Sequence, residues 1–145
     1  MPGIQLFEIE ISDCQSGASM MLAGGRDFTV EADPFYLTVD GLKWVMTMRD
    51  ATGLAGAAQR IEYRIRRAAE CGEAPKADAF FRRRLLDHSD TAVIELSLAA
   101  IGELAAVLFE FGAKRITLNL EDAPRLFAAL TRFGDDACMV QAAGP

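Results

Sequence analysis

The clearest alternation of apolar and polar positions lies between residues 91 and 134, where it predicts strand, helix, strand and helix. Residues 91–96 are apolar and branched enough for a mostly buried strand, and Ser97 stands where it could cap a following helix. Apolar residues then recur at intervals of three and four, which predicts a helix that ends at Gly112. The residues of this stripe are Leu98, Ile101, Ala105, Leu108 and Phe111.

The end of the same stretch predicts a second strand and a last helix. Residues 115–120 alternate strictly between apolar and polar side chains, and a helix is predicted from Asp122 to Gly134. Two strands that are joined by one helix should lie parallel in one sheet with a right-handed crossover. We therefore expect residues 91–96 and 115–120 to run parallel in the same sheet.

The N-terminal part of the chain shows strand patterns of period two. Residues 4–12 alternate, with Phe7, Ile9 and Ile11 on one face and acidic side chains on the other. Small and polar residues from 13 to 25 predict a loop in which residues 20–22 could form a short strand. One face of this first strand is therefore expected to be exposed to solvent.

A three-stranded antiparallel meander is predicted from residue 28 to residue 49. Residues 28–32 and 35–39 are the first two strands, and Asp40-Gly41 is a strong signal for a two-residue hairpin turn. This turn pairs residues 35–39 with residues 42–49. In the last strand we expect alternate side chains to face the core: Leu42, Trp44, Met46 and Met48.

Two further helices are predicted in the middle of the chain. One spans residues 54–71 and has an apolar stripe at helical spacing, with Cys71-Gly72 at its end. The other spans residues 75–87, begins at a proline, and carries Phe81 and Leu85 on one side.

Together these elements predict an α+β fold, and no internal repeat is evident. We expect a single globular domain over residues 1–145, built as a two-layer α/β sandwich. Its mixed sheet would have five or six strands, and about four helices would lie mainly on one face. Half-polar strands favour two layers over three, because a sheet covered on both faces would have continuous apolar strands.

Composition favours a cytoplasmic setting. The three cysteines, Cys14, Cys71 and Cys138, have no metal-binding spacing, and we interpret them as buried thiols in a reducing compartment. The N-terminus shows no export signal, and no apolar run reaches the roughly 18 residues of a membrane span. The preference for arginine over lysine is typical of a bacterium with a GC-rich genome.

The sequence offers little for catalysis. Its only histidine, His88, is followed by Ser89 and Asp90, but adjacent residues rarely form a triad, so a solvated turn is the favoured interpretation. No set of metal ligands is evident. Gly53–Gly56 lacks the lysine and hydroxyl of a phosphate loop, so no cofactor is expected.

Charge is distributed unevenly along the chain. Residues 51–84 hold eight basic and four acidic side chains, whereas the whole chain has a net charge of −6. Arg60, Arg64 and Arg67 should share one flank of their helix, and Arg82–Arg84 add three more charges. These arginines could form a solvated face, or a docking face for an acidic protein or a small anion. An acidic chain with few interleaved aromatic residues does not favour nucleic acid.

Three functions remain open. We rank first a noncatalytic protein-interaction or regulatory module, which would form a homodimer through its open sheet face or an edge strand; sedimentation at micromolar concentration tests the dimer. A small-ligand binder with a pocket between sheet and helices is the alternative, and an enzyme of unknown reaction is third. The pocket would be lined by Trp44, Met46, Met48, Tyr36 and Phe81. The candidate binding residues are Arg60, Arg64, Arg67, Arg82, Arg83, Arg84, Trp44 and Tyr36.

Overall fold

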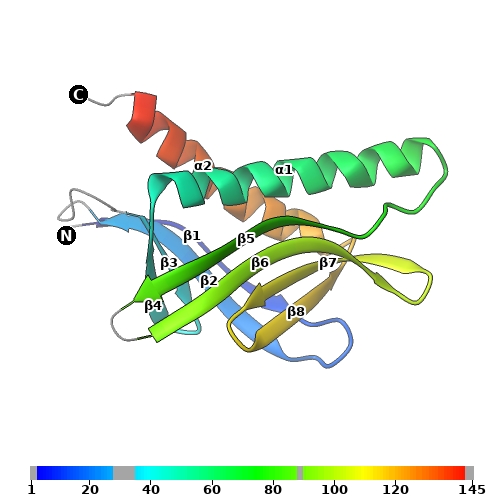
Figure 1. Ribbon diagram of the computed structural model, residues 1–145, viewed down its shortest axis with the longest axis horizontal. Coiled ribbons are helices and arrows are strands. Elements are labelled where there is room, and N and C mark those ends of the chain that lie inside the picture. Colours follow the sequence, from blue (N-terminus) through cyan, green and yellow to red (C-terminus); the bar gives the residue numbers. More distant parts are fainter. Residues whose placement is uncertain (1–2, 28–34, 88–89, 143–145) are drawn as a thin grey trace.

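The structure is a computed structural model that describes residues 3–27, 35–87 and 90–142 (Figure 1). In these ranges the chain forms eight strands and two helices. Their order is β1 (Gly3–Ser12), β2 (Ser19–Asp27), β3 (Phe35–Val39), β4 (Leu42–Met46), α1 (Met48–Glu70), β5 (Asp78–Asp87), β6 (Asp90–Ile101), β7 (Leu104–Phe111), β8 (Lys114–Asn119) and α2 (Ala123–Ala142).

The strands form two separate antiparallel sheets of four strands, each arranged in chain order. The first sheet contains β1–β4 and is followed by α1, and the second contains β5–β8 and is followed by α2, so the order ββββα occurs twice. The α+β character agrees with the sequence. The predicted single mixed sheet of five or six strands with about four helices is wrong.

The first error is the helix predicted after Ser97, because residues 98–111 form the β6–β7 hairpin. Ile101 pairs with Leu104, and the turn between them contains Gly102 at φ 62°. The strand at 91–96 and the strand near 115–120 do lie in one sheet, but β7 separates them and is antiparallel to both. The helical crossover is therefore wrong.

The second error is the helix predicted at 75–87, since most of this segment is strand β5. Phe81 and Leu85 are both buried, as we would expect if they lay on one side of a helix. A spacing of four residues places two side chains on the same face of a strand as well as of a helix, so this pair does not distinguish the two. A β-bulge between Ala79 and Phe81 also interrupts the alternation.

The third error concerns residues 13–25, where we predicted a loop with a possible short strand at 20–22. Residues 13–18 do form a turn, but the strand is longer than predicted, because β2 begins at Ser19. The two glycines of β2 are places of close approach rather than turns. A Cβ added at Gly24 would lie 2.3 Å from the Phe7 ring, and one at Gly25 would lie 2.4 Å from the Tyr36 hydroxyl. Glycine therefore makes room for aromatic side chains on both neighbouring strands.

Other predictions are confirmed. Asp40 and Gly41 have φ values of 50° and 86° and connect β3 to β4. The strand predicted at 42–49 is confirmed only as far as Met46, where β4 ends. Thr47 then caps α1 by accepting a hydrogen bond from the Asp50 N–H at 3.0 Å, so the helix begins at Met48 rather than at residue 54. The helix predicted to end near Cys71 does so.

Three of the predictions have a different outcome. The last helix begins near Asp122 as predicted, but it continues through Gly134 to Ala142. Leu42 is 67% exposed rather than part of the core. The strand predicted at 28–32 lies outside the described residues.

The two ββββα halves exchange their helices. Among the strands, α1 packs most on β5 and β6 of the second sheet, whereas α2 packs on β1 of the first (Figure 1). Phe7, next to the bulge in β1, meets Phe133 of α2 at a ring-centroid distance of 5.9 Å. Phe81, next to the matching bulge in β5, lies against Gly53 of α1. Buried residues of both halves therefore form one hydrophobic cluster.

The two helices also pack on each other. At the contact a Cβ added to Gly134 would lie 2.1 Å from the Cβ of Ala55, so the backbones approach closely only because this position is glycine. In the described part of the chain, no helix is both long and apolar enough to cross a membrane.

Asp13 joins the end of β1 to β8. Its Oδ1 accepts a hydrogen bond from the Thr117 N–H at 2.6 Å, and the Cys14 N–H donates to the Thr117 carbonyl oxygen at 2.8 Å. The Ser16 backbone N–H, followed by that of Thr117, lowers the pKa of Asp13 to about 2. Asp13 is therefore a structural carboxylate between the two sheets.

Candidate functional site

The C-terminal half of α1 presents a charged surface. The helix has 23 residues, and its buried residues all lie between Asp50 and Ile61. Beyond Ile61 the side chains are exposed, except that Ile65 and Ala68 are half-buried. The arginines of this half therefore remain accessible.

A first groove lies between this half of α1 and the beginning of β5. It has a volume of about 330 Å³ and is lined by Arg60, Tyr63, Arg64, Asp78, Ala79 and Phe80. The Arg60 Nη2 donates a hydrogen bond to the Phe80 carbonyl oxygen at 3.1 Å. The Arg64 guanidinium lies 5.3 Å from the centre of the Phe80 ring. Phe80 thus positions two arginines at one groove.

A second groove begins at Arg64 and continues toward the end of α1. It has a volume of about 250 Å³ and is lined by Arg64, Arg67, Lys76 and Glu73, together with Ala68, Cys71, Ala74 and Pro75. Arg67 forms an exposed ion pair with Glu70 at 3.3 Å. Arg64 lines both grooves, so they are neighbours, and we call the two together the α1–β5 surface.

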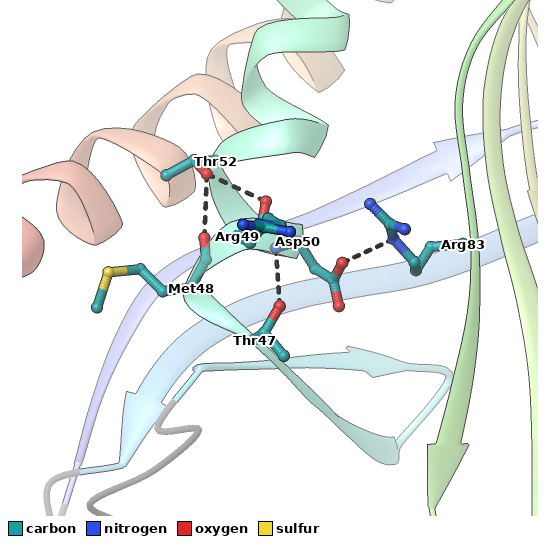
Figure 2. Close-up of polar contacts among 6 residues, drawn as sticks. All are labelled: Thr47, Met48, Arg49, Asp50, Thr52 and Arg83. Atoms are coloured by element: carbon teal, nitrogen blue, oxygen red, sulfur yellow. Dashed lines mark hydrogen bonds and ion pairs between the residues drawn. The ribbon is translucent and has the colours of Figure 1, made fainter.

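Two arginines of β5 form ion pairs with different parts of the molecule. Arg83 forms an ion pair with Asp50 in the first turn of α1 at 2.8 Å, beside the Thr47 cap (Figure 2). Arg82 pairs with Glu95 of the neighbouring strand at 3.7 Å. Arg83 therefore ties α1 to the second sheet, and only Arg60, Arg64 and Arg67 of the predicted arginines line the grooves.

The predicted aromatic residues do not come together. Trp44 is buried and its ring meets Phe111 at 5.4 Å, whereas Tyr36 lies on the other face of the first sheet, with Lys43 above its ring at 4.4 Å. The other residues of the predicted pocket belong to the packed core or border it: Met46, Met48 and Phe81. These side chains fill the space in which the sequence predicted a ligand.

Sequence reasoning found only the three arginines of the grooves and missed the other lining residues, among them Tyr63, Lys76 and Phe80. Lys76 and Phe80 were missed because residues 75–87 were predicted to form a helix. An aromatic residue beside the Arg82–Arg84 run was the available signal.

The structure offers little for chemistry at this surface. Cys14 and Cys71 are free and exposed, so the prediction of buried thiols is wrong for both. The described residues include no group of three or more histidine, cysteine or carboxylate side chains that could hold a metal ion. His88 lies outside the described residues.

No family model, curated protein or solved structure matches this chain.

Proposed function

We propose that this chain is a noncatalytic interaction module that docks a short acidic segment of a protein partner on the α1–β5 surface. The observation that carries the proposal is the pair of neighbouring grooves that share Arg64. Their charged lining residues are the basic Arg60, Arg64, Arg67 and Lys76 and the acidic Asp78 and Glu73. Four basic groups stand against two acidic ones, which gives a local positive charge on an acidic chain.

Arginine suits this role because its planar guanidinium binds a carboxylate through two parallel hydrogen bonds. Arg60 and Arg64 are also held in place by Phe80 before any partner arrives. Among the described residues, neither forms an ion pair that a partner carboxylate would have to displace. Less side-chain entropy is therefore lost on docking.

Charge balance favours a short acidic segment over a nucleic acid. The chain as a whole carries a net charge of −6, which repels a long polyanion. A short segment needs to contact only the two grooves. The residues that line the first groove include no histidine, serine or cysteine, which supports binding rather than nucleophilic chemistry there.

The test measures binding of a short fluorescein-labelled oligoglutamate peptide by fluorescence polarisation. We expect binding that weakens as salt rises from about 0.05 M to about 0.5 M, because exposed charges are screened. Reversing two groove charges, with Arg64→Glu and Arg67→Glu together, should weaken binding by about tenfold or more.

The matched control reverses two exposed arginines of α2, Arg125→Glu and Arg132→Glu, and so gives the same net charge. It should change the affinity by less than about twofold. Equal losses in the two variants would show that binding follows total charge alone and would contradict the proposal. Tighter binding of an oligothymidylate of the same length would favour a nucleic-acid function instead.

The homodimer remains a prediction. The outer face of the first sheet carries Met21 and Val45, which are 41% and 40% exposed, and these side chains would contribute to a contact between two copies. A bacterial cytoplasmic setting likewise remains a prediction.

A further inference from the structure

The end of α1 and the turn of the β6–β7 hairpin lie at the same end of the molecule (Figure 1). A further hollow lies between them. Its volume is about 560 Å³, within the range of sites that bind small molecules. Its walls come from the last turns of α1, the α1–β5 connection, the β6–β7 hairpin, the β8–α2 connection and the turn after β1. Segments far apart in the sequence therefore converge on one space.

The walls of this hollow are mainly apolar. Ile65 and Ala69 of α1 face the hairpin residues Ile101 and Leu104, and Leu120 lies on the α2 side. Leu104 is 74% exposed. Covering this leucine with the apolar part of a ligand would be favourable, because it would remove apolar surface from water.

The charged groups that line the hollow are acidic. Among the described residues, Glu73, Glu103 and Glu121 contribute to the lining, whereas no lysine or arginine does. In the part of the chain that the structure describes, none of these three carboxylates forms an ion pair. Many of the other described acidic residues do pair, as Asp50, Glu95 and Glu110 show.

We propose that this hollow binds a small amphiphilic cation. Its apolar body would lie against Ile65, Ile101 and Leu104, and its ammonium group would lie among the three carboxylates. Apolar walls alone would accept a neutral molecule equally well, whereas the unpaired carboxylates favour a cation and repel an anion. This hollow shares Glu73, Ala74 and Pro75 with the second groove of the α1–β5 surface, but it differs in the sign of its charge, because none of the basic residues of that surface lines it.

The experiment compares three compounds with the same apolar body: phenylbutylammonium, phenylbutanol and phenylbutyrate. Calorimetry should rank the cation first, the alcohol second and the carboxylate last, with the cation at least about fivefold tighter than the alcohol. Methyl resonances of Ile65, Ile101 and Leu104 should shift on titration. Binding of the carboxylate as tightly as the cation, or no shift at these methyls, would overturn the proposal.

Leu104→Arg should weaken phenylbutylammonium binding by about tenfold, because it places a cation at the apolar wall. Leu42→Arg is the matched control. Leu42 is 67% exposed, and like Leu104 it directly follows a hairpin turn, but it lies outside the hollow. It should leave the affinity within about twofold. Equal losses in both variants would contradict the site.

A second pair of variants tests the charges. Glu103→Gln combined with Glu121→Gln should bring the affinities of cation and alcohol to within about twofold of each other, while the alcohol affinity stays unchanged. Arg64→Glu with Arg67→Glu should leave phenylbutylammonium binding unaffected, which separates failure of this site from failure of the proposed function. Binding by an amphipathic cationic peptide but by none of the three compounds would replace the small molecule with a partner helix.

Discussion

The two helices end equivalent halves of the fold, yet they bury different kinds of side chain. α2 buries large residues, namely Leu126, Phe127, Leu130 and Phe133. α1 buries mostly small ones, with alanine at 51, 55, 57 and 58, and nothing beyond Ile61 is fully buried. The apolar content of the helix layer is thus concentrated in the second half.

This difference explains how one helix can carry surface charge. Small residues on α1 let α2 approach closely, as the contact of Gly134 with Ala55 shows. The last turns of α1 are less constrained by packing, because only the half-buried Ile65 packs against the core there. They carry Arg64 and Arg67, and their other flank borders the apolar hollow.

The largest expected effect comes from removing an aromatic side chain of α2. Phe133 is fully buried, and its ring meets those of Phe7 and Phe35 at 5.9 Å. Phe133→Ala should lower the free energy of unfolding by about 3–5 kcal/mol through lost burial and a cavity. Urea titration followed by Trp44 fluorescence and circular dichroism measures it. Tyr63→Ala on α1 is the control and should cost less than about 0.5 kcal/mol.

The next largest effect concerns Asp13. Asp13→Ala removes the acceptor of the buried Thr117 N–H and should cost about 2 kcal/mol at neutral pH. The folded-state pKa of Asp13 is lowered from 3.8 to about 2. The stabilisation is therefore complete above about pH 4 and is lost as pH falls toward 2. Urea titrations across this pH range should show the two proteins converging, and a constant difference would contradict the assignment.

The smallest effect compares one glycine from each helix. Gly134→Ala places a methyl group against Ala55 and should lower the free energy of unfolding by about 1–2 kcal/mol, because overpacking outweighs the better helix propensity. At Gly56 a Cβ would meet only the Arg60 guanidinium among the described residues, at 3.3 Å, and the end of this side chain can shift by the small distance required. Gly56→Ala should therefore raise stability by up to about 1 kcal/mol. Thermal unfolding measures both variants. A lower melting temperature for Gly134→Ala together with a higher one for Gly56→Ala would support the contrast, and a higher melting temperature for Gly134→Ala would contradict it.

The elements that could be predicted correctly from the sequence are those whose residue pattern fits only one kind of structure. Strand β1 alternates over several residues, and the Asp40-Gly41 turn requires two residues with positive φ, which few other pairs accept. Helix α1 has apolar residues at helical spacing over several turns and a glycine past its end. In each case the pattern itself excluded the competing structure.

The β6–β7 hairpin could not be separated from a helix in this way. Its strands are apolar on both faces: Val107 and Phe109 are buried on one face of β7, and Ala106 is buried on the other. Without alternation the two periods fit equally well. Gly102 was the useful signal, since a glycine inside a predicted helix also marks a turn. Missing β5 then concealed the groove, because Phe80 and Lys76 were placed on a helix.

The exchange of helices has a consequence for how the molecule opens. Strands β5 and β6 of the second sheet are covered by α1, which belongs to the first half of the chain, and β1 of the first sheet is covered by α2. If either helix detached, it would expose the sheet of the other half as well as its own apolar stripe. Partial unfolding of one half therefore removes the support of the other, and we expect the slowest-exchanging amides of both sheets to become exposed in a single cooperative event.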